Sequence, residues 1–556
     1  MRFVTCALSL LGLAGCASEV VGRASDVLDA IAPIDAPRDG TALDGRDGFD
    51  TADARDITDA PDATVDATDA GSAHCTPPRP IAPLSTSWVS TRSPTLRWEP
   101  GEAGSTTHIE FCRDRECTGE RRVMDSTDRS LRLESVAVGN SFWRVFRTCA
   151  DGTEATGAWW QFHVPRRGLA VDTSWGTVPD IDNDGYPELL VASSRTEIGR
   201  LYRGARDGVD ATRAWRVPIA NAYRPSFMSA GDVNGDGYGD VLGYEGSAPP
   251  GVVRVFYGDP TGLAFTRSTP LDGTPGSQFG LSMIALGDVD ADGYGDVLVG
   301  EPVASTLPGI NGAWFFRGGA HGIVTPGIAI HSPNRVRFAD TVATAGDVDG
   351  DGFDDALVGQ PSMGNALLYR GRASGLLDTA DLTLSGGGPT SSFGYSMALA
   401  GDTNGDGYSD VAIASSSFGS VRLFHGGVSG LQASEMSLLP GSGNSYGYAI
   451  AMAGDVDGDG FDDVIASGAG GSDSTDGTVY VSFGAPDGTP MRGVRVPVPM
   501  DARGFGWSVT GGADYDSDGF DDVAVGALGA DRTYVYRGNA SRAFDVPWLT
   551  LDGGQL

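Results

Sequence analysis

The chain has 556 residues, 82 of them glycine, and a formal net charge of −34 from 39 basic and 73 acidic side chains. The glycine share is about twice the usual one, and the length predicts several domains or one large repeat architecture instead of a single simple core. A sequence pI near 4.3 argues against a nucleic-acid partner, because this field would repel phosphates. The acidity is concentrated: residues 19–69 hold 14 acidic side chains, and seven short loops hold 29 more.

Residues 1–15 resemble a lipoprotein signal peptide. A basic start, Met1-Arg2, precedes an apolar run at residues 3–13, which is too short for a membrane-spanning helix of about 20 residues. The following Leu13-Ala14-Gly15-Cys16 is similar to the lipobox of bacterial lipoproteins. This resemblance implies export, cleavage before Cys16 and acylation of Cys16, so that the chain is lipid-anchored in the cell envelope, at the outer membrane or cell surface. A plain secretory signal is the alternative.

Residues 16–74 are predicted to form a disordered stalk. Large apolar side chains are few, and aspartate recurs every three or four positions between residues 44 and 69. Such a segment cannot bury enough surface to offset its ordering entropy, and its charges repel one another. A diffuse calcium-binding tract is the alternative, although nothing in this segment fixes ligands in space.

Residues 75–166 show the alternation of a small antiparallel β-sandwich, in runs such as 95–98, 108–111 and 142–146 separated by turn residues. The runs at 93–98 and 142–145 resemble those of a fibronectin type III domain.

Four cysteines remain after cleavage and acylation, and an even number in an exported domain predicts two disulfides. Three pairings are open. We favour a Cys112–Cys117 bond across a hairpin together with a Cys75–Cys149 bond.

Residues 167–556 are built from seven repeats, each marked by an Asp-rich nine-residue signature. The first aspartates are separated by 52, 56, 59, 55, 53 and 59 residues. Each signature is flanked by strand-like runs, such as Asp296-Val-Leu-Val-Gly300 after it and Val253-Arg-Val-Phe-Tyr-Gly258 further on. Every repeat can therefore form a four-stranded antiparallel sheet. Because seven such sheets bury both faces only by radial stacking, we predict an all-β chain with a small sandwich followed by a seven-bladed β-propeller. A linear β-solenoid is the structural alternative.

The repeats resemble FG-GAP repeats of the integrin α-subunit propeller family. The resemblance rests on a Phe-Gly strand start (Phe279-Gly280), the Asp-rich loop, and a Val-Gly-x-Pro continuation (Val299-Gly300-Glu301-Pro302). Three repeats depart from the strand start: the first has Trp175-Gly176, the second is shortened at 226–228, and the fourth has Phe338-Ala339.

The signature predicts a calcium loop. Oxygens at positions 1, 3 and 5 project to one side of a tight turn, glycine at position 6 permits the reversal, and the carbonyl at 7 and the carboxylate at 9 complete a shell of hard oxygens that suits Ca²⁺ better than Mg²⁺. An EF-hand is excluded because position 12 is not glutamate, and a solvated Asp-Gly turn is the alternative. We expect up to seven Ca²⁺ ions, with weaker binding where asparagine stands at position 3. The predicted ligands, loop by loop, are Asp180, Asp182, Asp184 and Glu188; Asp232, Asn234, Asp236 and Asp240; Asp288, Asp290, Asp292 and Asp296; Asp347, Asp349, Asp351 and Asp355; Asp402, Asn404, Asp406 and Asp410; Asp455, Asp457, Asp459 and Asp463; Asp514, Asp516, Asp518 and Asp522.

Catalytic motifs are missing from the sequence. The six histidines are scattered, and the nucleophile-like Gly394-Tyr-Ser396-Met-Ala398 recurs as a strand position. We therefore expect a binding or adhesion module for a protein partner. By analogy with integrins, the partner would contact the propeller face opposite the calcium loops, near residues 301–311, 331–337 and 467–476. A carbohydrate-binding propeller is the alternative, and a polysaccharide lyase or hydrolase is less favoured.

Overall fold

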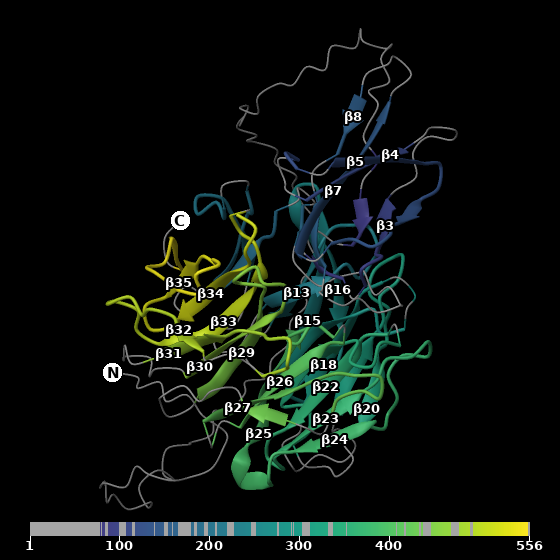
Figure 1. Cartoon of the computed structure of the whole chain (residues 1–556). Helices are drawn as coiled ribbons and strands as arrows, with labels where there is room; N and C mark the ends of the chain where they lie inside the picture. The colour runs from purple at the N-terminus through teal and green to yellow at the C-terminus, as the bar shows by residue number, and fades with distance from the viewer. Residues whose placement is uncertain are drawn as a thin grey trace, which may run out of the picture. The chain divides into compact units, whose positions relative to one another are not determined.

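The computed structural model describes residue 78 and, with gaps, residues 80–553, and almost all of its regular structure is β-strand (Figure 1). The described part includes one short 3-10 helix, η1 (Pro389–Ser391), and no helix there has the length and apolarity that a bilayer crossing demands. The signal peptide, Cys16 and the stalk lie outside the described residues, so their predictions are untested. The residues not described are 1–77, 79, 84–86, 90, 99–106, 114–116, 120, 138, 149–153, 158–159, 165–179, 183–185, 194–197, 206–207, 219–226, 246–251, 275–276, 291, 293, 303–311, 332–336, 352, 407, 416, 418, 433–434, 438–445, 469–476, 490–492, 517 and 554–556.

The described residues between 80 and 164 form a two-sheet sandwich, as the alternating sequence predicts. Three buried tryptophans, Trp98, Trp143 and Trp160, fill its core, and the last two pack edge to face with ring centroids 6.0 Å apart. The smaller sheet has the order β1 (Pro80–Ala82), β3 (Thr95–Trp98), β6 (Ser130–Arg132), and the larger has the order β2 (Ser87–Trp88), β9 (Trp160–Val164), β7 (Gly139–Thr148), β4 (Thr107–Cys112), β5 (Arg121–Ser126), with β8 (Glu154–Thr156) also paired to β7.

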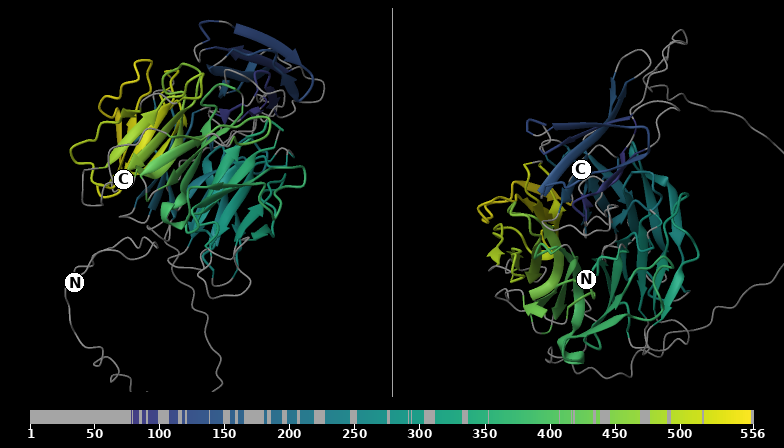
Figure 2. Two further views of the ribbon diagram at one scale, coloured as in Figure 1. Left: turned by 60° about the horizontal axis from the view of Figure 1, so that its bottom comes forward. Right: turned by 45° about the vertical axis from the view of Figure 1, so that its right-hand side comes forward.

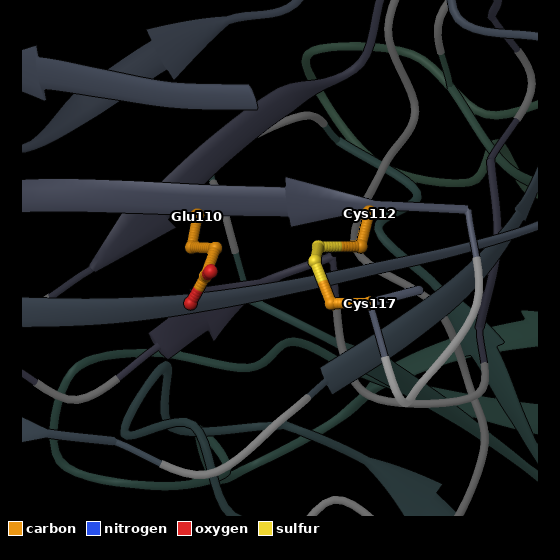
Figure 3. Close-up of side chains that lie close together, drawn as sticks. All are labelled: Glu110, Cys112 and Cys117. Atoms are coloured by element: carbon orange, nitrogen blue, oxygen red, sulfur yellow. A yellow bond between two sulfur atoms is a disulfide. The ribbon is translucent and has the colours of Figure 1, made fainter. Parts of the chain in front are cut away.

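One of the two expected disulfides lies within the described residues. Cys112 ends β4 and is bonded to Cys117, in the turn that leads to β5, so the prediction of a hairpin-closing bond is confirmed (Figure 3). Cys75 and Cys149 both lie outside the described residues, and their pairing stays a prediction.

Seven antiparallel sheets follow, one for each sequence repeat, and we number them blades 1 to 7. In the six complete blades, four consecutive strands pair in chain order, and the signature lies between the first and second strands. In blade 1 the segment before the signature is not described. The strands are β10 (Leu189–Ser193), β11 (Ile198–Tyr202) and β12 (Ala214–Pro218) in blade 1; β13 (Phe227–Gly231), β14 (Asp240–Glu245), β15 (Val252–Asp259) and β16 (Gly262–Leu271) in blade 2; β17 (Ser282–Gly287), β18 (Asp296–Glu301), β19 (Gly312–Phe316) and β20 (Ile328–His331) in blade 3; β21 (Thr341–Gly346), β22 (Asp355–Gln360), β23 (Asn365–Tyr369) and β24 (Leu382–Ser385) in blade 4; β25 (Phe393–Gly401), β26 (Asp410–Ser415), β27 (Ser420–Phe424) and β28 (Glu435–Ser437) in blade 5; β29 (Tyr446–Gly454), β30 (Asp463–Gly468), β31 (Thr478–Ser482) and β32 (Val494–Arg495) in blade 6; β33 (Phe505–Ala513), β34 (Asp522–Ala527), β35 (Arg532–Tyr536) and β36 (Leu549–Asp552) in blade 7.

The second strands read as continuous apolar runs because both of their faces are covered. In β18, Val297 and Val299 belong to the cluster shared with blade 2, whereas Leu298 belongs to the cluster shared with blade 4. Successive side chains of a strand point to opposite faces, so one run of valine and leucine serves two neighbours. Strands β22, β26 and β30 are buried along their whole length in the same way.

Apolar clusters join the blades into a closed ring. Within the described residues, each blade shares one cluster with the next, from blades 1 and 2 through to blades 6 and 7. A seventh cluster packs Leu189 and Tyr202 of blade 1 with Tyr515 and Leu551 of blade 7. From blade 2 to blade 7, the first strands of successive blades contact one another and form the inner row. Figure 2 shows the sheets, coloured from teal to yellow, following one another around the ring.

Side chains, not exchanged strands, close the ring among the described residues. All four strands of blade 7 come from the C-terminal repeat. Across the junction, the buried guanidinium of Arg200 donates to the carbonyl oxygens of Asp552 (3.3 Å) and Gly553, and the hydroxyl of Tyr202 donates to the same Asp552 carbonyl (3.2 Å).

We predict that Arg200→Leu destabilises the ring. The substitution leaves buried carbonyls without a charged donor, a loss that costs about 1.5–3 kcal/mol. A urea titration of the full chain should show a lower unfolding midpoint. The exposed Arg213→Leu is the matched control and should keep the wild-type midpoint; equal midpoints for both variants would contradict a closing role for Arg200.

Candidate metal centres in the signature loops

The seven signature loops occupy one position in the blade architecture. Position 1 follows the first strand and position 9 begins or directly precedes the second, as in blade 3, where Asp288 follows β17 and Asp296 opens β18. Because all complete blades share this connection, their loops lie at the same end of the inner strands. The prediction that the loop joins strands, not helices, is confirmed.

The position-9 carboxylate is buried and fastens the loop to its own blade. Asp296 is 0 % exposed; its Oδ2 accepts the N–H of Val289 at position 2 (3.0 Å) and its Oδ1 accepts the N–H of Gly318 after the third strand (2.8 Å). The other six loops repeat this pair of contacts: Ile181 and Gly204 to Glu188 (2.7 and 3.4 Å), Val233 and Gly258 to Asp240 (3.0 and 2.9 Å), Val348 and Gly371 to Asp355 (3.1 and 2.8 Å), Thr403 and Gly426 to Asp410 (3.0 and 2.9 Å), Val456 and Gly484 to Asp463 (3.0 and 2.9 Å), Tyr515 and Gly538 to Asp522 (3.0 and 3.0 Å).

The position-1 carboxylate shapes the turn itself. In blade 2, Asp232 Oδ1 accepts the N–H of Asp236 (3.1 Å) and Oδ2 accepts the N–H of Gly237 (2.7 Å), while Asp236 Oδ1 accepts the N–H of Tyr238 (3.1 Å). Gly237 has φ of 80°, which a side chain would strain. The glycine at position 6 is therefore required by the reversal, as the sequence predicts.

Carboxylate oxygens converge in these loops as a cation site requires. Ligand atoms of positions 1, 3 and 9 lie within 4.8 Å of one another in blades 1, 3 and 6, as do those of positions 1, 3 and 5 in blade 4. At position 3, the buried Oδ1 atoms of Asp290, Asp349 and Asp516 have no hydrogen-bond partner in the described part of the chain. Buried oxygens of this kind need a partner. A hard cation such as Ca²⁺, which is bound by oxygen ligands, fits them. Asp184 lies outside the described residues.

Burial, and after it the crowding of acids inside the loops, opposes the ionisation of these carboxyl groups. Burial first, then neighbouring aspartates, raise the pKa of Asp232, Asp455 and Asp514 to about 7. At position 9, burial raises the pKa of Asp240, Asp296 and Asp522 well above the ordinary value, against the lowering effect of the N–H donors. A bound divalent cation would remove this repulsion.

Main-chain hydrogen bonds link the loops to one another. The N–H of position 8 donates to the position-1 carbonyl of the preceding loop, and the only loop that cannot do so among the described ones is the first, where Pro187 has no N–H. The link therefore runs from loop 1 to loop 7 and stops at the junction that Arg200 bridges. The donors and acceptors are Gly239 to Asp180 (2.7 Å), Gly295 to Asp232 (2.9 Å), Asp354 to Asp288 (3.1 Å), Ser409 to Asp347 (3.1 Å), Asp462 to Asp402 (3.2 Å) and Asp521 to Asp455 (3.2 Å).

Three acids that the sequence analysis did not single out reinforce this link. Asp354, Asp462 and Asp521 occupy position 8, and each Oδ2 accepts the N–H of position 1 in the preceding loop, at 2.9, 2.6 and 3.0 Å respectively. Burial raises their pKa well above the ordinary value. The signal was an Asp-Asp doublet at positions 8 and 9 of the fourth, sixth and seventh signatures.

A further acid and sulfur cluster in the sandwich does not suit a metal. Glu110, Cys112 and Cys117 lie close together (Figure 3), but both sulfurs are consumed by the disulfide. The Glu110 carboxylate pairs with Arg121 and with Arg144, whose Nε donates to Oε2 at 2.6 Å.

Most of the predicted partner-binding segments lie outside the described residues, and that prediction is untested. Of their described residues, Glu301 is buried and accepts the N–H of Thr274 (2.7 Å) and the indole N–H of Trp314, which is a structural role.

We predict that position 9 is structural and position 5 is not. Asp296→Ala removes the acceptor for two buried N–H groups and should cost about 2–5 kcal/mol even in chelator. The exposed Asp292→Ala should cost under about 1 kcal/mol in chelator and should weaken only the stabilisation by calcium. Urea unfolding of both variants with EDTA and with Ca²⁺ measures the difference; similar losses in EDTA would contradict it.

We also predict opposite pH trends with and without calcium. The raised pKa values of Asp232, Asp455 and Asp514 mean that the folded chain binds more protons than the unfolded chain between pH 4 and pH 7, so in EDTA the free energy of unfolding falls as pH rises through this range. Calcium needs the deprotonated carboxylates, so its stabilising effect should grow over the same range. Thermal melts at several pH values test both trends. Asp455→Asn should flatten the slope in EDTA, and an unaltered slope would count against this assignment.

Comparison with known proteins agrees with this geometry. A family model for FG-GAP-like repeats matches residues 180–243, 347–413 and 402–466, and one for the FG-GAP repeat matches residues 505–543. These segments match FG-GAP repeats, so the resemblance to an integrin-α-like propeller is confirmed.

Several curated integrin α chains match part of the repeat region. Integrin alpha-V of Gallus gallus is 30% identical over 214 residues, which are 34% of this chain and 20% of that one. Integrin alpha-IIb of Homo sapiens is 34% identical over 179 residues, 29% of this chain and 17% of that one. The chain thus spans about a fifth of these relatives. A Bacteroides fragilis structure described as a candidate 6-phosphogluconolactonase has a TM-score of 0.43 and 12% identity, covering 66% of this chain and 96% of that one.

Proposed function

We propose that this protein is a calcium-binding β-propeller that acts without catalysis as a binding module for a protein partner, held at the cell envelope by lipid on Cys16. The converging loop oxygens support calcium as the resident ion, and its role would be to hold the loops and to offset their charge. The integrin α likeness supports a non-enzymatic binding role. The lipobox-like Leu13-Ala14-Gly15-Cys16 supports the anchor.

A row of three aromatic side chains carries the proposal of a partner-binding face. Tyr395, Tyr448 and Trp507 are half-buried and lie on the adjacent inner strands β25, β29 and β33. Their ring centroids are 6.1 Å apart for the two tyrosines and 5.2 Å apart for Tyr448 and Trp507. Seven residues separate each of them from position 1 of the loop, roughly 20 Å along the strand, so the row lies at the end opposite the calcium loops.

The aromatic-Gly pair that begins these strands explains the row. Gly394 has φ of 84°, and the register with β26 shifts between Phe393 and Met397. A β-bulge of this kind re-aims the side chains beside it. While Phe393 is fully buried, Tyr395 is left partly exposed. Clustered tyrosine and tryptophan are typical of the energetic centre of a protein interface.

We predict that this row is needed to capture the partner. The Tyr395→Ser/Tyr448→Ser/Trp507→Ser variant, displayed as the full chain with a cross-linker, should lose the proteins that wild type retains from intact cells. The 99%-exposed Met500→Ser is the matched control and should retain them, and EDTA should weaken capture by wild type.

Identical capture by the triple variant would contradict this face, provided that its melting temperature in calcium matches wild type. Binding to a glycan array that the same triple variant abolishes would replace the protein partner with a carbohydrate. Turnover of a polysaccharide by the wild type would overturn the non-enzymatic role.

A further inference from the structure

Arginines stand beside the position-3 carboxylates of the signature loops. In blade 3, Nε of Arg317 lies 3.1 Å from Oδ2 of Asp290, and in blade 4 NH1 of Arg370 lies 2.7 Å from Oδ2 of Asp349. Arg203 pairs with Asp182 in blade 1 and Arg537 with Asp516 in blade 7. Each of these four arginines directly follows the third strand of its own blade and precedes a glycine.

Each arginine pairs with one oxygen of the position-3 carboxylate and not with the other. In Asp290, Asp349 and Asp516 the paired atom is Oδ2, and Oδ1 is the buried atom without a hydrogen-bond partner within the described set. These side chains are only 3–6% exposed. The guanidinium therefore restricts the carboxylate to one orientation and leaves Oδ1 for an ion.

The two loops with asparagine at position 3 are built differently. Their residues at the arginine position are Tyr257 and His425. The amide is instead held within the loop: Asn234 Oδ1 accepts the N–H of Asp236 (2.9 Å) and its Nδ2 donates to Asp236 Oδ2 (3.0 Å). Asn404 makes the same two contacts with Asp406, at 2.8 and 3.1 Å.

Blade 6 obtains its arginine by another route. Phe483 stands at the arginine position, and Arg542 of blade 7 pairs with Asp457 at position 3 and lies 2.8 Å from Asp459 Oδ2. Its guanidinium lies over the Phe483 ring, 5.3 Å from the centroid. All five position-3 aspartates thus have an arginine, although two different elements supply it.

We propose that Arg317, Arg370 and Arg537 are positioning residues for calcium: each holds Oδ2 of the position-3 carboxylate so that Oδ1 meets the ion. The inference rests on the proposed calcium binding. Outer contacts of this kind orient ligands, and their removal typically lowers metal affinity 10–100-fold. An arginine acting only as a counter-charge would have the opposite effect, because its removal would strengthen the attraction for a cation.

The arginine pairing also changes how the loops are expected to rank in calcium affinity. Counting positions 1, 3, 5, 8 and 9, the aspartate loops of blades 1 and 3 with their arginines and the two asparagine loops without one all carry a formal charge of −3. Charge alone therefore does not make the loops of Asn234 and Asn404 the weaker ones. The two classes differ in whether an arginine also holds position 3 from outside the loop, since Asp457 Oδ1 accepts the N–H of Asp459 (3.1 Å) just as the two asparagines accept theirs.

The test uses the full chain, dialysed against buffered calcium and analysed for bound metal. Wild type should bind up to seven ions. The Arg317→Gln/Arg370→Gln/Arg537→Gln variant should lose roughly one to three ions at a free calcium concentration that nearly saturates wild type, as a 10–100-fold loss of affinity at three sites requires. The exposed Arg213→Gln should lose none. Unchanged or increased binding by the triple variant would overturn the proposal, and a wild type that binds no calcium would instead overturn the proposed function.

A rescue separates positioning from loss of fold. Arg317→Tyr alone should weaken one site, while Asp290→Asn/Arg317→Tyr, which gives blade 3 the pair found in blade 2, should regain at least half of the lost occupancy. A double variant that binds no better than the single one would contradict the positioning role. Melting curves in EDTA, in which both variants should remain cooperative, confirm that binding is compared between folded chains.

Discussion

The buried carboxylate at position 9 is the interaction on which each blade depends. It begins or directly precedes the strand that is covered on both faces, and its two oxygens accept main-chain N–H groups from position 2 of the loop and from the glycine near the end of the third strand, such as Gly318. A single side chain thereby holds three segments of the blade together. It accepts N–H groups that have no partner on a neighbouring strand. Because an unpaired buried N–H is costly, an acid is needed here whether or not an ion is bound. The stabilising contact in turn places an ionisable carboxyl group in the interior of every blade.

The rest of the loop surrounds that carboxyl group with further charged groups. Five further kinds of group lie around it: the acids at positions 1, 3 and 5, the occasional acid at position 8, and an arginine beside position 3. Asp354, Asp462 and Asp521 reach the preceding loop, where each accepts the N–H of position 1. The loops are consequently not independent sites, since each one is hydrogen-bonded to the one before it as far as the junction that Pro187 interrupts. An ion bound in one loop would restrain its position-1 carbonyl group, which accepts the position-8 N–H of the next loop.

The sequence predicted the repeated part of this design and missed the part that depends on contacts between repeats. Periodic aspartates, the glycine at position 6 and apolar runs such as Val297-Leu298-Val299 are local signals, and they led to the loops, the turns and the seven sheets. The arginine that precedes the glycine after the third strand is a local feature of four repeats, but only its ion pair with the position-3 carboxylate indicates what it does. Arg542 could not have been assigned at all, because it reaches Asp457 from another blade. The Cys112–Cys117 bond could be predicted because the two cysteines are only five positions apart in the sequence.

The inner strands of blades 5, 6 and 7 connect the two ends of the molecule that matter for binding. Their C-terminal ends lead into signature loops, and their N-terminal ends carry Tyr395, Tyr448 and Trp507. An ion and a partner would thus act on the same three strands, roughly 20 Å apart, with no shared ligand. Coupling between them must pass through the placement of neighbouring inner strands, which are packed against one another and whose loops are joined by main-chain hydrogen bonds. Calcium would then favour partner binding by keeping the aromatic row assembled, in the way that ordering a surface in advance lowers the cost of association.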